Sequence, residues 1–166
     1  MSSVDYILDS NVFIEAWGKY YSPDFCTGYF PSLEQLGRDG ILAIPEMVHR
    51  EIEKKSDELY DWMKGSDIPV LPITEGVQKA LRNLYQKDSK HKRLADTSKG
   101  RSLADPWVIA HAMIEEAVVV SKEEKIVTPG STKVKIPNVC DAMVVRCIQD
   151  YEFIAEVDIR FEAGLS

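Results

Sequence analysis

The sequence predicts an α/β domain with three layers, in which helices cover both faces of a mainly parallel central sheet. Three observations support this fold class: short apolar runs alternate with segments of helical period, turn-forming residues separate them, and no repeat or low-complexity tract interrupts the order. Strands joined through helices run parallel and are buried on both faces, which explains why the runs are almost wholly apolar. With 166 residues, the chain is long enough for one domain, residues 1–166, with a substantial core.

Short apolar runs that end in Pro, Asp, Asn or Ser predict the strands. The run AVVVS at residues 117–121 is the most strongly strand-like of them, since three consecutive valines favour a pleated, buried conformation. In chain order, the expected strands lie within residues 4–8, 41–45, 68–73, 117–121 and the second half of 136–148.

Segments with apolar residues three and four positions apart predict the helices between these strands. Thr74 is a suitable N-cap for one helix, and Ser102 is expected to open a long one. The expected helices cover about residues 11–20, 31–40, 46–63, 74–85, 102–117, the first half of 136–148 and 150–157. Turn formers and polar residues make residues 21–30 and 87–101 loops.

The charge of the chain narrows the function classes. A net charge of −7 at pH 7 argues against a general nucleic-acid coat protein, whose surface would be basic. It does not exclude an enzyme that acts on nucleic acid, because such an enzyme needs only local positive charge or metal ions held by its own acidic groups. The chain has no apolar stretch of membrane-spanning length and no secretory signal at its beginning. Cys26, Cys140 and Cys147 form no CxxC pair, so we expect reduced thiols in a cytoplasmic protein without a membrane partner.

The stretch VDYILDSNVFI places polar residues, with Asp9 first, between two apolar runs. One interpretation is structural, because Asp, Ser and Asn are all good N-caps for a helix that follows a strand. The other is functional, because ligands of parallel α/β sheets bind beyond the carboxyl ends of the strands. Asp9 lies at that edge.

Three further acids are expected at or near the same edge. Glu51 falls beside the apolar stripe of the helix after the second strand, where a glutamate can also simply reach water. Asp105 lies in the first turn of the helix that Ser102 is expected to open, and SLAD resembles a capping box. Glu123 and Glu124 follow the AVVVS strand, where SKEEK can also be a solvated turn.

The four acids together are harder to explain structurally than each alone. At ~5 Å and an effective dielectric constant of about 20, each pair of carboxylates costs roughly 3 kcal/mol. Such groups stay apart, take up a proton or bind a cation. Carboxylates without Cys or His favour Mg²⁺ or Mn²⁺ over zinc, and His49, His91 and His111 have no metal-ligand spacing. A Mg²⁺ cluster at this position usually acts on phosphate esters.

The order of the motifs YILDSN, EMVHREIE, SLADPWVIAHA and VVVSKE resembles the PIN-domain ribonucleases. It is most similar to the branch related to VapC toxins of toxin–antitoxin pairs, and the similarity covers nearly the whole chain. The resemblance implies a PIN-like three-layer α/β/α fold and an active site for Mg²⁺ or Mn²⁺. Its implied catalytic and metal-binding residues are Asp9, Glu51, Asp105 and Glu123, with Asn11 supporting the first aspartate and Ser121 in the place of a common threonine.

The fourth acid departs from the family pattern, which usually has Asp there. The two-residue spacing from Ser121 favours Glu123, and Glu124 beside it remains the alternative. The implied activity is metal-dependent hydrolysis of RNA phosphodiester bonds by an endoribonuclease that leaves a 5′-phosphate and a 3′-hydroxyl. The implied partners are an RNA substrate and a protein antitoxin, and homodimerisation is left open.

Two other functions remain in view. One is a catalytically silent PIN-like domain that only binds RNA or protein. The other is a phosphatase of the haloacid-dehalogenase type, which also begins with an aspartate at a strand end. Those phosphatases use a DxD pair, and here the third position is Asn11, which disfavours this alternative.

The segment KDSKHKRLADTSKGR at residues 87–101 concentrates basic residues in an otherwise acidic chain. We expect Lys90, Lys92 and Arg93 to bind RNA phosphates beside the metal site. The alternative is a solvated loop whose charges only keep the protein soluble. The basic residues of the segment are Lys87, Lys90, Lys92, Arg93, Lys99 and Arg101.

Overall fold

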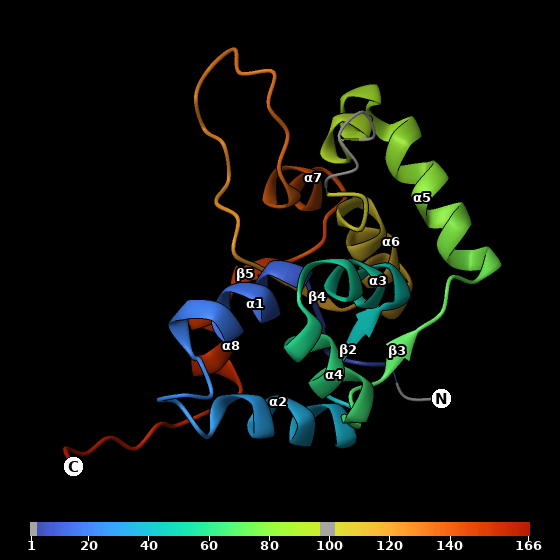
Figure 1. Cartoon of the computed structure of the whole chain (residues 1–166). Helices are drawn as coiled ribbons and strands as arrows, with labels where there is room; N and C mark the ends of the chain where they lie inside the picture. The colour runs from blue at the N-terminus through green and yellow to red at the C-terminus, as the bar shows by residue number, and fades with distance from the viewer. Residues whose placement is uncertain (1–2, 97–101) are drawn as a thin grey trace.

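The computed structural model of the chain describes residues 3–96 and 102–166. At its centre lies a sheet of five strands in the spatial order β3-β2-β1-β4-β5 (Figure 1). The strands are β1 (Tyr6–Leu8), β2 (Leu42–Pro45), β3 (Val70–Leu71), β4 (Val118–Ser121) and β5 (Cys147–Gln149). Every neighbouring pair is parallel. Four strands lie within the expected apolar runs, and β5 extends one residue beyond the fifth run, to Gln149, so the predicted sheet is confirmed.

β1 occupies the middle of the sheet, where Tyr6 pairs with Leu42 of β2 on one side and with Val118 of β4 on the other. The chain builds β2 and β3 outward on one side and then β4 and β5 on the opposite side, so its direction across the sheet reverses at β1. At such a reversal, the connections after the two central strands diverge and leave a crevice beyond their carboxyl ends. The residues that follow β1 and β4 therefore meet at the place where α/β proteins bind their ligands.

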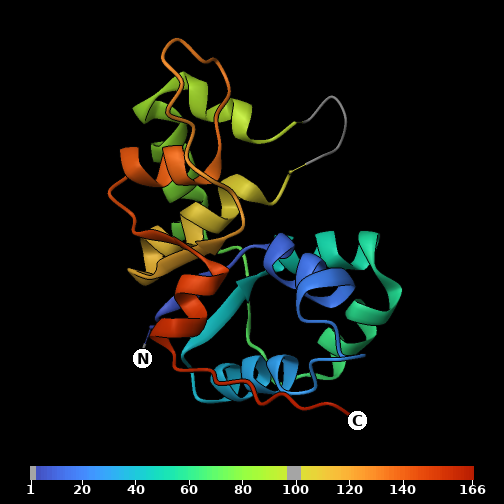
Figure 2. The ribbon, with the colours of Figure 1, turned by 90° about the vertical axis from the view of Figure 1, so that its left-hand side faces the viewer.

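Helices cover both faces of the sheet (Figure 2). On one face, α6 (Asp105–Glu115) packs against β1, β2 and β4, with α5 (Glu75–Lys87) outside it and α7 (Ile136–Ala142) beside it. On the opposite face, α2 (Tyr29–Arg38) packs against β2, and α8 (Asp150–Glu156) packs against β4 and β5. This division follows from right-handed crossovers, which place helices on opposite faces when the strand order reverses. The predicted three-layer α/β/α fold is confirmed.

The prediction of a single helix over residues 46–63 is wrong, because the structure has two helices there. α3 (Glu46–Lys55) ends before Ser56, and α4 (Asp57–Gly65) begins after it. The Ser56 hydroxyl accepts a hydrogen bond from the backbone N–H of Leu59 at 3.4 Å, which makes Ser56 the N-cap of α4. A serine followed by two acids is a typical helix start, and here that local signal interrupts a continuous apolar stripe.

The helix expected over residues 11–20 also differs in detail. α1 (Ser10–Glu15) starts one residue earlier, and the chain continues as a π-helical segment, η1 (Ala16–Tyr20). Thr74, in contrast, caps α5 as predicted, since its hydroxyl accepts a hydrogen bond from the N–H of Val77 at 3.2 Å.

Ser102 does not open α6, which corrects the expectation for that helix. The helix begins at Asp105, its N-cap is Ala104, and Ser102 has a left-handed backbone with a φ of 54°. The resemblance of Ser102–Asp105 to a capping box is therefore misleading. Pro106 in the first turn explains the start, because proline lacks only an N–H that the first turn would leave unpaired.

The basic segment is not wholly an exposed loop. Residues 89–94 form a 3₁₀ helix, η2 (Ser89–Leu94), in which His91 and Leu94 are buried. Lys99 and Arg101, which were expected to belong to the same basic surface, lie outside the described residues. Within the described ranges, no helix is both long enough and apolar enough to cross a membrane.

Candidate metal centre

Asp9 follows β1 directly and caps α1. Its Oδ1 accepts a hydrogen bond from the backbone N–H of Ser10 at 2.8 Å, so the expected capping role is present. The side chain is fully buried, however, and Oδ2 has no hydrogen-bond partner among the residues that the structure describes. A buried carboxylate oxygen without a partner is costly. Capping alone therefore does not explain why an acid stands here.

Glu51 reaches the start of α1 from α3. Its Oε1 accepts a hydrogen bond from the Ser10 hydroxyl at 2.8 Å and pairs with the Lys55 ammonium at 3.2 Å. The Glu51 side chain is only 12% exposed, so it does not extend into water as a glutamate at the edge of an apolar stripe usually would. Ser10 is the first residue of α1, and its two hydrogen bonds link Glu51 of α3 to Asp9 at the end of β1.

Asp105 is buried at the first position of α6, with 5% of the residue exposed. An acid at a helix N-terminus benefits from the helix dipole, but this benefit of up to about 2 kcal/mol does not require burial of the carboxylate. Because Ser102 does not form the expected capping box, local helix chemistry gives no reason for burying this carboxylate. Its position in the crevice beyond β1 gives a better one.

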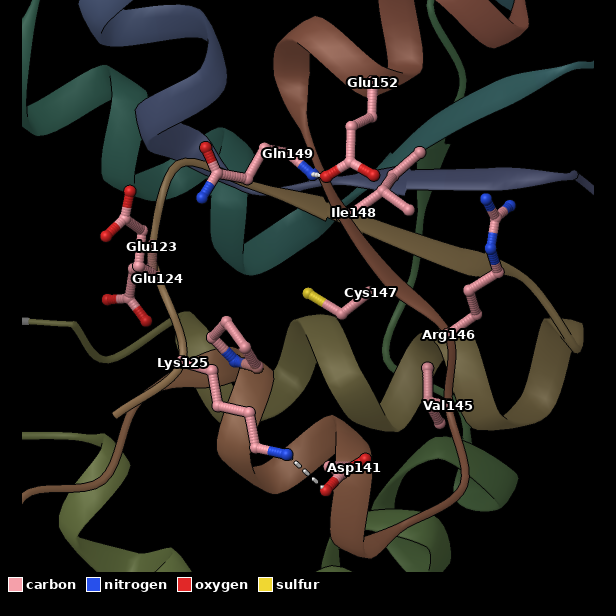
Figure 3. A pocket seen from close by; sticks show the side chains of 11 residues that line it. Glu123, Glu124, Lys125, Asp141, Val145, Arg146, Cys147, Ile148, Gln149 and Glu152 are labelled. Carbon is pink, nitrogen blue, oxygen red and sulfur yellow. Dashed lines mark hydrogen bonds and ion pairs between the residues drawn. The ribbon is translucent and has the colours of Figure 1, made fainter. Parts of the chain in front are cut away.

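Glu123 follows β4, and hydrogen bonds fix both its backbone and its carboxylate. Its backbone N–H donates to the hydroxyl of Ser121 at 3.1 Å, and its Oε2 accepts a hydrogen bond from the backbone N–H of Ile136 at 2.8 Å. Ser121 is fully buried, whereas Glu124 is exposed. Figure 3 shows both glutamates on the wall of a pocket of about 340 Å³ beside β5.

The electrostatics indicate that the four acids act on one another. Burial raises the pKa of Asp9 to about 7, with further increases from the charges of Glu123 and Glu51. Burial likewise raises the pKa of Asp105 to about 9, and Asp9, Glu123 and Glu51 add to the effect. Lys55 lowers both pKa values in part. The structure thus brings Glu51 and Glu123 within electrostatic reach of both buried aspartates.

The donor set suits a hard divalent cation. In the two described ranges, no three His, Cys, Asp or Glu side chains stand in ligand geometry around one point. The cause is visible for two of the acids, since Glu51 is turned toward Ser10 and Lys55, and Glu123 toward Ile136. The free Oδ2 of buried Asp9 and the mutual repulsion are what a cation would relieve. Carboxylate oxygens alone favour Mg²⁺ or Mn²⁺, so the residues fit the expected ion.

Asn11 lies near Glu123, but the hydrogen bond that orients Asp9 does not come from it. It lines a second pocket of about 540 Å³ together with Lys122 and Glu123. The hydrogen bonds to Asp9 and Glu51 come instead from Ser10, so the supporting role of Asn11 stays a prediction. Ser121 has a defined contact, since it holds the backbone of Glu123.

The three predicted RNA-binding residues lie on η2, which contacts both α5 and α6. All three are exposed, and the guanidinium of Arg93 donates to the carbonyl of Thr132 at 3.2 Å. Lys90 and Lys92 extend from the same short helix, which the buried His91 fixes through a 2.7 Å contact between its Nδ1 and the Leu84 carbonyl. These cations therefore stand on a structured support, and their role with RNA stays a prediction.

Two residues of this site are not predicted from the sequence. The motif around Ser10 indicates only a turn or a helix cap, and its bond to Glu51 spans a separation of 41 residues that no local pattern reveals. Lys55 had a readable signal, because it stands four residues after Glu51 on one helix, the usual spacing of an ion pair.

A second ion pair at the edge was also missed. Lys122 pairs with the buried Asp150 at 3.0 Å and lies over the ring of Tyr20 at 4.3 Å. Asp150 is thereby paired with a cation within the fold. It belongs to the packing of α8 against β4.

The chain matches one protein family in sequence and resembles solved structures in fold. The sequence profile of the family described as a domain of unknown function, DUF4411, matches residues 6–161. A chain of VapBC2 from Rickettsia felis, solved bound to a DNA fragment from its promoter, is 15% identical, with a TM-score of 0.54 over 88% of this chain and 98% of that one. A chain of FitAcB from Neisseria gonorrhoeae is 14% identical, with a TM-score of 0.49 over 86% and 96%. No curated protein matches the sequence. The similarity to the VapBC2 chain confirms the predicted three-layer α/β/α fold.

Proposed function

Since this chain belongs to the DUF4411 family and has the fold of the VapC-like PIN domains, we propose that it is a metal-dependent endoribonuclease. The reaction is hydrolysis of RNA phosphodiester bonds at the four-acid centre. The observation that carries the proposal is the buried Asp9, whose Oδ2 has no partner among the described residues while two other acids raise its pKa. Capping α1 uses only Oδ1, and burial of the unpartnered Oδ2 costs free energy that a bound cation would offset.

Each acid has a distinct part in the proposal. Asp9 and Asp105 are the buried ligands, fixed by the end of β1 and the start of α6. Glu51 and Glu123 are less buried and leave their present partners to complete the site. When bound there, Mg²⁺ or Mn²⁺ supplies Lewis-acid activation of the phosphodiester and of the attacking water.

The residues around the acids hold and orient them. Ser10 fixes Asp9 through its N–H and Glu51 through its hydroxyl, and Ser121 fixes Glu123. Residues behind metal ligands set their orientation and usually matter for both affinity and rate. A covalent nucleophile is not needed, because water attacks the phosphorus.

RNA binding and a protein partner complete the proposal. Lys90, Lys92 and Arg93 bind backbone phosphates, which offsets the repulsion between RNA and a protein of charge −7. VapBC2 is a complex solved on promoter DNA, which supports the view that this chain is also the toxin of a toxin–antitoxin pair. Its partner is then a small protein antitoxin, and we expect the pair in the cytoplasm.

The test is cleavage of structured RNAs by the purified chain with Mg²⁺ or Mn²⁺, compared with EDTA. We expect fragments that carry a 5′-phosphate, formed only with metal, and no cleavage by the Asp9→Asn variant. Wild-type protein that binds Mn²⁺ and RNA but cuts none of the RNAs would instead favour the silent RNA-binding alternative. Cleavage that persists in EDTA would contradict the metal centre.

A further inference from the structure

A pocket of about 230 Å³ opens between α3 and the segment that precedes α6. It adjoins the candidate metal centre directly, because Glu51 is part of its wall and Ala104 immediately precedes Asp105. The residues that line it are Met47, Arg50, Glu51, Lys54, Lys55, Ser102, Leu103 and Ala104. Any molecule in this pocket would lie beside the acids.

The lining has two chemically different sides. Met47, Leu103 and Ala104 provide an apolar surface. The last turn of α3 provides the cations Lys54 and Lys55. The pocket thus combines an apolar surface with positive charge, in a chain whose net charge is −7.

Arg50 contributes less free charge than the two lysines. Its guanidinium pairs with Glu46 at 2.9 Å, one turn earlier on the same helix. The positive side of the pocket therefore depends on Lys54 and Lys55.

Lys55 is the cation that faces the metal centre. Its ammonium lies 3.2 Å from Oε1 of Glu51, and its charge also lowers the pKa of Asp9 and of Asp105, on two other elements. A lysine ammonium has three N–H donors, so contact with Glu51 leaves donors for a second anionic group.

We propose that this pocket binds one nucleotide of single-stranded RNA next to the scissile phosphate, with its base against Met47 and Leu103 and its phosphate on Lys55 and Lys54. The inference rests on the proposed nuclease function and adds the residues that position the substrate. Lys55 is a positioning residue that bridges Glu51 and the RNA backbone.

The size and chemistry of the pocket favour this occupant. Its volume of about 230 Å³ lies below the roughly 300–1,000 Å³ of sites for larger ligands, so it accommodates a group of the size of one base. Proteins bind single strands by combining a positive groove for the backbone with side chains, usually aromatic, on which the bases stack. In this pocket, the apolar side chains of Met47 and Leu103 take the place of the aromatic ones. Bases in single-stranded RNA are free to turn out of the stack and enter such a pocket.

The experiment measures binding of a short fluorescein-labelled oligouridylate by anisotropy, in EDTA and over a salt series. The variants are Lys55→Met, Lys55→Arg and Leu103→Ala, and Lys64→Met is the matched control. Lys64 is also a partly exposed lysine near a helix end, but it lies on α4 and pairs with Asp61. Thermal melting of every variant verifies that it is folded.

We expect Lys55→Met to weaken RNA binding about tenfold, as the loss of one charged hydrogen bond predicts. It should also lower the salt slope by about 0.7, the value for one phosphate contact in a single strand. Lys55→Arg should restore most of the affinity, and Lys64→Met should bind like the wild type. If Lys55→Met and Lys64→Met give overlapping curves, or if the wild type does not bind the oligomer, the inference is overturned.

A second measurement tests the apolar side of the pocket. Oligomers with one abasic nucleotide, moved along the sequence, should weaken binding to the wild type at one position. At that position, the abasic nucleotide should not further weaken binding by the Leu103→Ala variant. The missing base and the Leu103→Ala substitution remove the same contact between the base and Leu103. Equal losses for both proteins at every position would contradict base binding in the pocket.

Parallel cleavage assays with Mn²⁺ separate this inference from the proposed function. Wild-type protein that cleaves RNA while all pocket variants bind normally would refute the nucleotide site and keep the nuclease. Wild-type protein that never cleaves, but loses RNA affinity in Lys55→Met, would refute the nuclease and keep the nucleotide site.

Discussion

The hydroxyl of Ser10 donates a 2.8 Å hydrogen bond to Oε1 of Glu51, a residue 41 positions later in the chain. The backbone N–H of the same serine donates to Oδ1 of Asp9, also at 2.8 Å. One buried residue thus orients two acids that come from different elements and repel each other. The two acids are therefore brought together only when α3 packs against the end of β1 as it does in this fold.

Replacing Ser10 with alanine should weaken the site more than the fold. Without the hydroxyl, Glu51 keeps Lys55 as a partner and turns away from Asp9. We expect a loss of about 10–100-fold in Mn²⁺ affinity, as for other residues behind metal ligands. The free energy of unfolding should fall by only about 1 kcal/mol, the usual value of one hydrogen bond. Titration calorimetry and thermal melting measure the two effects, and Ser32→Ala on the far helix α2 is the control.

Replacing Asp9 with asparagine should abolish metal-dependent cleavage without unfolding the protein. The substitution preserves the shape of the side chain and removes a charge that Glu123 and Glu51 oppose. Because burial and repulsion both raise the pKa of Asp9, the metal-free variant should be more stable at pH 8 by about 1 kcal/mol or more. Cleavage at the wild-type rate by a variant with this stability would refute the assignment of Asp9.

The fourth ligand can be decided by comparing two neighbouring glutamates. Glu123→Gln should lose most of the activity, because Glu123 raises the pKa of both Asp9 and Asp105 and is held by Ser121 and Ile136. Glu124→Gln should lose little, since Glu124 is exposed beside the same pocket. Cleavage assays on the pair decide between them. Greater sensitivity at Glu124 would mean that the ligand lies one residue further along the chain.

Metal-free stability should depend on pH because of the two buried aspartates. The pKa of Asp9 is raised to about 7 and that of Asp105 to about 9, above the value near 3.8 expected in the unfolded chain. Folding therefore favours their protonated forms, and the stability that they contribute is complete below pH 3.8 and is lost as pH rises through 7 and 9. In EDTA, the melting temperature should fall between pH 6.5 and 9.

His111 limits the pH range over which the contribution of the two aspartates to stability can be measured. Its burial lowers its pKa to about 4, so its contribution is present above pH 6.5 and is lost as pH falls toward 4. Below pH 6.5, the histidine therefore opposes the aspartates. The Asp9→Asn variant should show a smaller decline above pH 6.5. An identical decline in variant and wild type would contradict the raised pKa of Asp9.

The fold was readable from the sequence because its signals are local and repeated. Each strand is a short apolar run, and the strand-helix alternation itself implies a parallel sheet. The errors lie where a single residue overrides a periodic pattern. Ser56 divides an otherwise continuous amphipathic helix, and Ser102 adopts a positive φ instead of capping α6.

The sequence predicts which acids form the site, but it does not predict the hydrogen bonds that orient them. The positions of Asp9 and Glu123 after two central strands follow from the topology alone. The bond from Ser10 to Glu51 and the bond from Glu123 to the N–H of Ile136 are tertiary, and they depend on how helices are placed on the finished sheet. No sequence period encodes such contacts.

The basic surface on η2 gives the last prediction. In a 3₁₀ helix, residues three apart stand above one another, which explains why His91 and Leu94 are buried together while Lys90, Lys92 and Arg93 are exposed. Replacing the three exposed cations with alanine should leave this helix in place, because the buried side is unchanged.

The triple variant should weaken binding of RNA across sequences and flatten its dependence on salt. Each lost phosphate contact should lower the slope of log affinity against log salt by about 0.7 in single strands, so the full effect is about 2. Mn²⁺ affinity should not change, since no proposed ligand is touched. The measurement is RNA affinity over a salt series for wild type and variant, with Lys64→Met as the control for an unrelated lysine. Curves that coincide would mean that the three cations of η2 only solvate the surface and do not bind the RNA backbone.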